Sequence, residues 1–364
     1  MTLQELFIKL LNCRSITPHD DGALDFIEEY LSDFEAVRID KNGVKNLFLH
    51  KKFGDGEHLC FAGHVDVVPP GEGWDSDPFS AVIKDGFVYA RGAQDMKSGV
   101  AAFVQSCKEA KKFNGTLSVL LTSDEEGEGK YGTLEVLKYL KEKKFLPDFA
   151  IVAEPTCEEM FGDSLKIGRR GSINGVIELF GKQGHAAYPE KSINTINLIA
   201  PLLVKLSAHN FDEGDENFAP SQLVITDIRS GMEVTNVTPG YLKLMFNVRN
   251  STKTSKEDIE NYINNVFNGL KYKISLKLSS KPFIIKRDSK VVKILAKSSE
   301  EITGIKANLR TTGGTSDARF FSEYGVKAIE LGVVNDRIHA LNERCSLEEI
   351  ESLKKIFDKV IKKF

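Results

Sequence analysis

Apolar positions in the first half of the chain form short runs separated by amphipathic segments. Residues 57–68 (EHLCFAGHVDVV), 116–122 (TLSVLLT) and 149–153 (FAIVA) have the length of buried strands, whereas 97–112 and 132–144 have the spacing of helices. Strands that alternate with helices predict an α/β domain with a mainly parallel central sheet.

The pattern changes after Gly171. Residues 172–181 (SINGVIELFG) alternate polar and apolar, as expected of a strand with one face in solvent. The order that follows is β-α-β-β-α-β, with helices near 194–207 and 255–269 and strands near 222–229, 241–249 and 272–280. This order predicts a ferredoxin-like α+β unit.

The α/β pattern returns from about Pro282, with a strand at 327–332 and a closing helix. We therefore expect a catalytic domain made of residues 1–173 and 283–364, interrupted by an inserted domain at 174–282. Two domains suit a chain of 364 residues. The closing helix begins Ser346-Leu-Glu-Glu349, which predicts a capping box.

Composition narrows the classes of function. Lys and Arg number 49 against 52 Asp and Glu, so charge gives no reason to expect nucleic acid or an anionic membrane as a partner. No run approaches the ~20 apolar residues of a membrane span, and the N-terminal MTLQELFIKLLNC lacks the features of a signal peptide. The five cysteines are scattered without a C-x-x-C pair, which is typical of a reduced, cytoplasmic protein.

Acidic residues and histidines gather where the predicted α/β strands end, which is where open α/β sheets bind ligands. His64 and Asp66, two apart on a strand, are expected to point to the same side. They either share a hydrogen bond in a turn or form a zinc ligand and the carboxylate that orients it. Asp95 either caps the helix at 97–112, holds a metal, or does both.

Three further segments complete this set. The acidic run 123–129 (SDEEGEG) is either a solvated loop or a cation site, Glu154 follows the strand at 149–153, and His339 follows the strand at 327–332. Two histidines and four carboxylates on five segments predict a metal centre. Their number suits two metals about 3.5–4 Å apart.

Five motifs, in this order, resemble the zinc-dependent aminoacylase and carboxypeptidase G family: GHVDVVPPG, YARGAQDMKSG, TSDEEG, AEP and IHALNE. A second set resembles the branch of that family that hydrolyses N-succinyl-LL-2,6-diaminopimelate to succinate and LL-2,6-diaminopimelate, in lysine and peptidoglycan-precursor biosynthesis: KIGRRGS, GKQGHAAYP, TNVTP, FNVR and TTGGTSDAR. The likeness covers essentially the whole chain. One departure is Val334, where the family usually has proline, and it leaves the spacing of Asn335 and His339 unchanged.

The resemblance implies two Zn²⁺ ions per subunit, with Co²⁺ able to substitute. The ligands that it implies are Asp95 as the bridge, His64 and Glu154 on one ion, and Glu126 and His339 on the other. Glu125 is then the general base that takes a proton from the attacking water, and Asp66 orients His64. Glu125 and Glu126 can have different tasks because neighbouring side chains in an extended segment point in opposite directions.

The resemblance also implies a homodimer formed through the inserted domain. There His185 supplies an oxyanion donor to the partner subunit's site, and its alternative role is that of a structural histidine in a loop. Substrate carboxylates need fixed cations, for which the candidates are Lys166, Arg169 and Arg249. The remaining pocket positions are Tyr188, Asn236, Thr315 and Asn335. Arg170 is expected to point away from the pocket.

Two other functions stay open from the sequence. A sister enzyme on the same scaffold, such as an acetylornithine deacetylase or a carboxypeptidase, would keep the metal ligands and differ in the pocket. A non-catalytic binding protein would have lost ligands, whereas every expected ligand and Glu125 are present.

Overall fold

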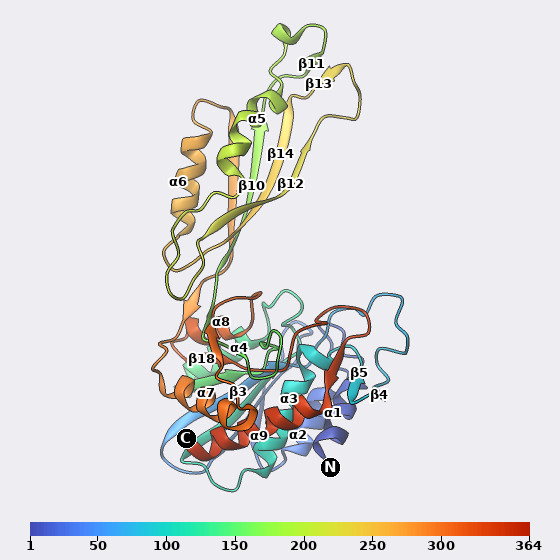
Figure 1. Cartoon of the computed structure of the whole chain (residues 1–364), viewed down its shortest axis with the longest axis vertical. Helices are drawn as coiled ribbons and strands as arrows, with labels where there is room; N and C mark the ends of the chain where they lie inside the picture. The colour runs from blue at the N-terminus through green and yellow to red at the C-terminus, as the bar shows by residue number, and fades with distance from the viewer. The chain divides into compact units, whose positions relative to one another are not determined.

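The computed structural model describes residues 1–364, which fold into two compact units (Figure 1). The first unit comprises Met1–Gly168, Ile284–Arg310 and Ser316–Phe364. The inserted unit comprises Arg169–Phe283 and Thr311–Thr315. The inserted unit interrupts the first in sequence, so both chain termini belong to the first unit.

An eight-stranded sheet forms the centre of the first unit. Its order is β1 (Glu35–Arg38), β2 (Asn46–Lys52), β6 (Gly115–Thr122), β3 (Glu57–His64), β7 (Phe149–Val152), β18 (Lys327–Glu330), β8 (Ser164–Lys166) and β17 (Asn308–Arg310). The central strands β6, β3, β7 and β18 are parallel. This confirms the predicted α/β class with a mainly parallel sheet.

Helices cover both faces of this sheet (Figure 1), which explains why β6 is buried along its whole length. They are α1 (Leu3–Leu11), α2 (Ala23–Tyr30), α3 (Ser98–Glu109), α4 (Thr133–Glu142), α7 (Lys290–Thr303), α8 (Ala318–Glu323) and α9 (Leu347–Lys363). A small antiparallel sheet contains β4 (Val82–Lys84), β5 (Phe87–Tyr89) and β19 (Arg344–Ser346).

β3 ends at His64, four residues earlier than the apolar run predicted. Beyond His64 the chain pairs with an N-terminal segment, since Val67 N–H donates to the Ser15 carbonyl at 2.9 Å and Thr17 N–H to the Val67 carbonyl at 3.0 Å. The regular alternation of a strand therefore ends before Asp66, although the two side chains still lie together, with Oδ1 of Asp66 3.6 Å from Nδ1 of His64.

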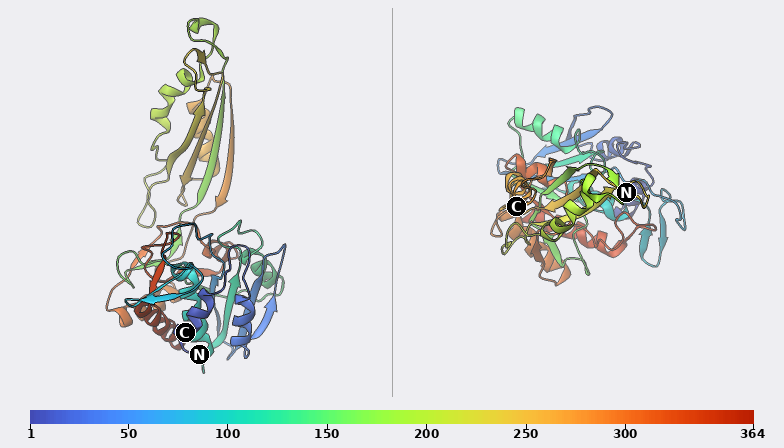
Figure 2. Two further views of the ribbon diagram at one scale, coloured as in Figure 1. Left: turned by 90° about the vertical axis from the view of Figure 1, so that its right-hand side faces the viewer. Right: turned by 90° about the horizontal axis from the view of Figure 1, so that it is seen from above.

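The inserted unit has the predicted β-α-β-β-α-β order. Its elements are β10 (Ser172–Phe180), α5 (Thr195–Leu206), β12 (Gln222–Ser230), β14 (Tyr241–Arg249), α6 (Lys256–Val266) and β15 (Tyr272–Ser280). The sheet order β12-β14-β10-β15 is antiparallel and ferredoxin-like. Figure 2 shows the four strands side by side, and α5 and α6 bury the apolar side chains of one face, including Ile177, Leu244 and Phe246.

The capping box predicted at the start of α9 does not form. Ser346 makes no side-chain cap, and the Glu349 carboxylate instead accepts the backbone N–H of Val334 at 3.0 Å. A contact with a distant loop thus replaces the local one. Across the chain, none of the helices has both the length and the apolar character needed to cross a bilayer.

Candidate metal centre

Two neighbouring parallel strands present His64 and Glu154. β3 and β7 are in register through Ala62 and Val152, so β3 ends at His64 beside the segment that continues from β7 to Glu154. Nε2 of His64 lies 3.9 Å from Oε1 of Glu154, and the two side chains are 1% and 9% exposed. Strand register therefore fixes this half of the site.

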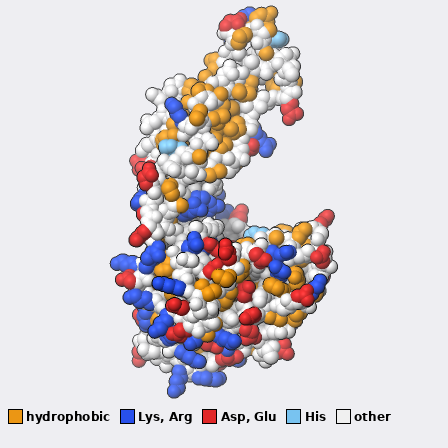
Figure 3. Space-filling model, viewed as in Figure 1, with side chains coloured by type: hydrophobic (Ala, Val, Ile, Leu, Met, Phe, Trp, Pro, Cys, Tyr) orange, Lys and Arg blue, Asp and Glu red, His pale blue; other side chains and the backbone are white.

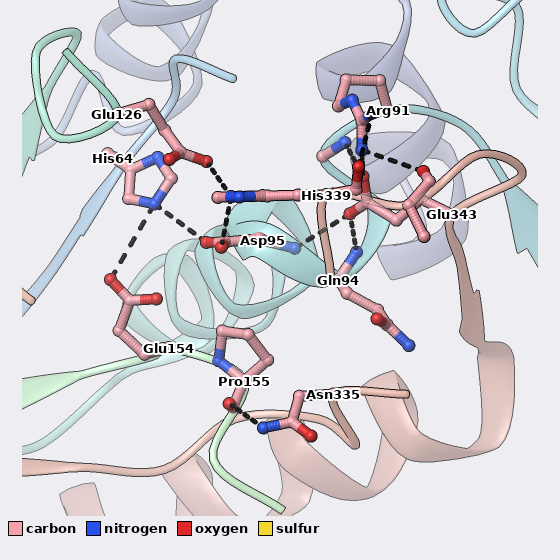
Figure 4. Close-up of polar contacts among 12 residues, drawn as sticks. His64, Arg91, Gln94, Asp95, Glu126, Glu154, Pro155, Asn335, His339 and Glu343 are labelled. Atoms are coloured by element: carbon pink, nitrogen blue, oxygen red, sulfur yellow. Dashed lines mark hydrogen bonds and ion pairs between the residues drawn. The ribbon is translucent and has the colours of Figure 1, made fainter. Parts of the chain in front are cut away.

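Asp95 lies between the two histidines (Figure 4). Its Oδ1 is 3.1 Å from Nε2 of His64, and its Oδ2 is 3.3 Å from Nε2 of His339. Asp95 sits in a short π-helical turn, Ala93–Lys97, with non-helical φ and ψ of −113° and 98°. α3 begins at Ser98 without a side-chain cap. Of the alternatives for Asp95, helix capping is therefore wrong, and its carboxylate instead lies toward the two histidines.

Glu126 completes the far side of the cluster, with Oε1 2.9 Å from Nε2 of His339. Glu125 lies on the other side, where one of its oxygens is within 4.8 Å of donor atoms of His64 and Glu154. Residues 125–128 form a turn, so the expected extended segment is wrong. The two glutamates nevertheless belong to different groups of candidate ligands, Glu125 with Glu154 and Glu126 with Asp95.

Asp66 is fully buried beside His64. The shortest contact of Nδ1 of His64 is to the backbone carbonyl of Asp66, at 2.9 Å, whereas the carboxylate oxygen lies at 3.6 Å. The carboxylate accepts the backbone N–H groups of Glu125 at 3.4 Å and Glu126 at 3.1 Å. Asp66 therefore contacts both the imidazole and the turn that carries the two glutamates.

The site is electrostatically crowded. Burial and the nearby charge of Asp95 raise the pKa of Glu154 well above its usual value, and burial raises the pKa of Asp66 to about 6. Hydrogen bonds to Asp95 and Glu126 raise the pKa of His339 to about 10. Against its burial, Asp95 is held at a low pKa by its bonds to His339 and His64.

This donor set fits divalent cations. Five carboxylates face one another around two imidazoles, and most of them are buried, so a cation would relieve their mutual repulsion. His64, Glu125 and Glu154 form one group with ligand atoms within 4.8 Å of one another, and His64, Asp95 and Glu126 form another. Imidazole and carboxylate donors suit hydrolytic zinc. The acidic run at 123–129 thus contributes to the cluster.

The sequence comparison decides the family. Residues 60–363 match the model of peptidase family M20/M25/M40. The chain belongs to this family. The predicted family is confirmed, and the candidate ligands His64, Asp95, Glu126, Glu154 and His339 all fall within the matched range.

The curated relatives of this M20 chain extend over its full length. It is 64% identical over 364 residues to the succinyl-diaminopimelate desuccinylase of a Nitratiruptor species, covering 100% of both chains. It is 58% identical to the protein of the same name from Nautilia profundicola, again with 100% of both covered.

Solved structures share the fold of this chain. A tripeptidase from Staphylococcus aureus superposes with a TM-score of 0.81 at 21% identity, covering 99% of this chain and 97% of that one. A dinuclear metal-binding M20 peptidase from Bacillus subtilis superposes with a TM-score of 0.72 at 12% identity, covering 98% of each.

Three predicted site residues of this M20 chain lie together in the inserted unit, at a two-stranded antiparallel sheet formed by β11 (Gly184–His185) and β13 (Val237–Thr238). His185 pairs with Val237, and the N–H of Ala186 donates to the carbonyl of Asn236 at 2.9 Å. The rings of His185 and Tyr188 lie 5.8 Å apart, and all three predicted side chains are exposed. Nδ1 of His185 accepts the backbone N–H of Ala187 at 3.0 Å, so the alternative role of a structural histidine in a loop stays open.

The predicted cations divide between the units. In the inserted unit, Arg169 is buried and donates to the carbonyl of Gly314 at 3.1 Å, next to Thr315, and Arg249 ends β14. In the first unit, Lys166 ends β8 and pairs with Glu158 at 3.0 Å, so a carboxylate of the chain already contacts its ammonium.

Asn335 lies in the first unit on the loop before His339. Its backbone N–H donates to the carbonyl of Cys157 at 3.1 Å, and its side chain reaches the carbonyl of Pro155 at 3.5 Å (Figure 4). These bonds fix the loop to the segment that follows Glu154.

Sequence reasoning missed two charged residues, Arg91 and Glu343. The expectation that Arg170 points away from the pocket stays a prediction; its burial, with the charge of Arg249, lowers its pKa. Arg91 and Glu343 form a buried pair behind Asp95, at 2.7 Å. Both lie inside motifs quoted for the family resemblance, YARGAQD and IHALNE, but no local pattern connects them.

Proposed function

We propose that this chain hydrolyses N-succinyl-LL-2,6-diaminopimelate to succinate and LL-2,6-diaminopimelate. The observation that carries the proposal is identity of 55–64% to six curated proteins named succinyl-diaminopimelate desuccinylase, over at least 97% of each chain. The intact cluster of candidate ligands supports catalysis rather than binding alone.

His64 and Glu154 would hold one zinc ion, Glu126 and His339 a second, and Asp95 would bridge them. The support is geometric, since the two oxygens of Asp95 face one histidine each, at 3.1 and 3.3 Å. When bound, two zinc ions supply Lewis acidity that polarises the amide carbonyl and makes the attacking water more acidic.

Glu125 moves the proton in this proposal. It accepts the proton of the attacking water at a carboxylate oxygen and delivers it to the amine nitrogen as the amide C–N bond breaks. Burial and the neighbouring acids Asp317, Glu126 and Asp95 raise the pKa of Glu125 well above its usual value, although His64 opposes this. A carboxyl group in such surroundings is suited to acid–base exchange.

Fixed cations and hydrogen-bonding groups would bind the carboxylates of the substrate. Arg169 and Arg249 offer guanidinium groups in the inserted unit, with Lys166 in the first unit. The remaining pocket residues proposed are Tyr188, Asn236, Thr315 and Asn335.

The inserted unit would form a homodimer that brings His185 to the partner subunit's site as an oxyanion donor. β12 is an edge strand of its sheet, and Val224 and Ile228 on it are 51% and 41% exposed. Ile196 and Val204 on α5 are 46% and 83% exposed, and apolar side chains gather over this part of the unit in Figure 3. An exposed apolar surface beside an unpaired edge strand suits association with a second copy.

The test is succinate release from N-succinyl-LL-2,6-diaminopimelate by chelator-stripped protein, with and without zinc. Turnover that depends on zinc is the expected result. Acetylornithine is assayed in parallel, and faster cleavage of this acetyl substrate would overturn the proposal in favour of a sister enzyme. Zinc uptake without turnover of either substrate would contradict the assigned reaction while retaining the metal centre.

A further inference from the structure

Glu343 lies completely buried behind the turn that carries Asp95. Its Oε1 accepts the backbone N–H groups of Gln94 at 2.7 Å and Asp95 at 3.1 Å, and its Oε2 accepts that of Gly92 at 2.9 Å. One carboxylate therefore satisfies three backbone donors of a single turn. Gly92 has a φ of 83°, in the left-handed region that favours glycine, which brings these donors to one point.

Arg91 connects the same carboxylate to the loop of His339. Its side chain is 2% exposed, and Nη1 donates to Oε2 of Glu343 at 2.7 Å. The guanidinium also donates to the backbone carbonyls of His339 and Ala340, each at 3.3 Å (Figure 4), and to that of Pro70 at 3.2 Å. A planar group with five donors can make all these bonds at once, which an ammonium group cannot.

Gln94 makes a second connection between the same two segments. Its Oε1 accepts the N–H of Arg337 at 2.9 Å, and its Nε2 donates to the carboxylate of Asp336. The turn at 91–95 is thus bonded to the loop at 336–343 on two sides. Asp95 and His339, whose side chains meet at 3.3 Å, are carried by these two segments.

The backbone of His339 needs such support. Its φ is 60°, a left-handed conformation that is unfavourable for a residue with a Cβ. The side chain is 46% exposed, so burial contributes little to its placement. By contrast, His64 and Glu154 follow two strands held in register by the central sheet.

We propose that Glu343 and Arg91 are positioning residues that set the distance between Asp95 and His339, and so control the affinity of the metal site that contains Glu126 and His339. The site that contains His64 and Glu154 depends on strand register and is affected less. This inference rests on the proposed two-metal centre. It predicts that loss of the Arg91–Glu343 ion pair weakens the binding of one metal ion more than that of the other.

The test is a zinc titration of the full-length, chelator-stripped protein against a chromophoric chelator of known affinity. His339→Ala and His64→Ala identify which binding step belongs to which site. We expect Glu343→Gln to weaken the step that His339→Ala removes by about 10- to 100-fold, as is usual for residues that orient metal ligands. The other step changes by less than about threefold, and no turnover measurement is needed.

Two further variants distinguish a specific effect on metal binding from a general folding defect. Arg91→Lys keeps the charge but not the fork of donors, and we expect the same selective loss. Glu301→Gln removes a carboxylate that pairs with Lys359 and Lys363 on the surface, and it serves as the matched control with unchanged steps.

Equal weakening of both steps, or none, in the Glu343 and Arg91 variants would overturn the inference while leaving the two-metal centre standing. Failure of the unmodified protein to bind zinc would overturn the proposed function and this inference with it.

Discussion

The carboxylate of Asp66 accepts a hydrogen bond from the backbone N–H of Glu126, at 3.1 Å from its Oδ2. Its Oδ1 lies 3.4 Å from the backbone nitrogen of Glu125. The same residue orients the imidazole of His64 through its backbone carbonyl, at 2.9 Å. The two halves of Asp66 therefore have separable roles, one toward the glutamate turn and one toward the histidine.

We expect Asp66→Asn to lower kcat by about 10- to 100-fold while zinc at the His64 site is retained. The backbone carbonyl that orients His64 remains, whereas an amide NH₂ cannot accept the N–H of a glutamate. Steady-state kinetics and the metal content of the same preparation measure the two effects. Loss of zinc at the His64 site, with no separate effect on kcat, would mean that the carboxylate itself orients the imidazole.

Glu125→Gln should retain zinc and lose activity, because it preserves shape but cannot take a proton. The expected decrease in kcat is about 10²- to 10⁴-fold. Its matched control is Glu126→Gln, which should lose affinity for one ion because Glu126 contacts His339 at 2.9 Å. If the Glu125 variant lost metal and the Glu126 variant did not, the two assignments would be exchanged.

His185→Ala should lower kcat by about 10²- to 10³-fold, the usual effect of losing an oxyanion donor, without dissociating the proposed dimer. A mixing experiment tests whether the histidine acts in the partner subunit's site. Co-refolded His185→Ala and Glu125→Ala chains would form mixed dimers with one complete site, restoring about a quarter of full activity at equal mixing. A histidine acting within its own subunit restores nothing, and this outcome would refute the cross-subunit arrangement.

His58 predicts a pH dependence of stability away from the metal centre. Its ring packs at 4.9 Å from that of Phe145, and Nε2 lies 2.8 Å from Oγ of Ser118. Burial lowers the pKa of His58 from 6.5 to about 4, opposed by Asp148 and assisted by His50. Since the folded pKa is below the unfolded one, the stability from the neutral ring is present above pH 6.5 and is lost as the pH falls toward 4.

His58→Gln should flatten that part of the stability curve, because glutamine keeps a hydrogen-bonding group and does not titrate. As the pH falls across this window, the free energy of unfolding of the unmodified protein should decrease by up to about 3 kcal/mol more than that of the variant. Urea unfolding of stripped protein between pH 7 and about pH 4 measures it, with the exposed His19→Gln as control. If the free energy of unfolding of His58→Gln fell with pH as steeply as that of the unmodified protein, His58 would not be the group that causes the loss of stability in acid.

Local patterns predicted much of the fold. Alternating residues located β14 and β15 at their observed bounds, because solvent on one face of a strand is visible in sequence. The candidate ligands were predictable because histidines and acids at the ends of apolar strands are unusual. The turn at 125–128 could not be predicted from the sequence, since its backbone N–H groups bond to the carboxylate of Asp66.

Contacts between distant segments account for the other differences. Glu349 bonds to the loop at Val334 instead of capping its own helix. Arg91 and Glu343 are 252 positions apart, and a buried ion pair has no periodicity that could connect them. Only the folded structure shows that both lie next to the turn that carries Asp95.

The five candidate ligands come from positions between 64 and 339, so the chain assembles them only by folding. Neither ion of the proposed pair has a comparable site on the unfolded chain, because the ligands of each come from segments that are distant in sequence. Such an ion stabilises the folded state by mass action, by about 2.7 kcal/mol at a free concentration one hundred times its dissociation constant. The abundance of folded protein, as well as its turnover, would then rise and fall with the supply of free metal.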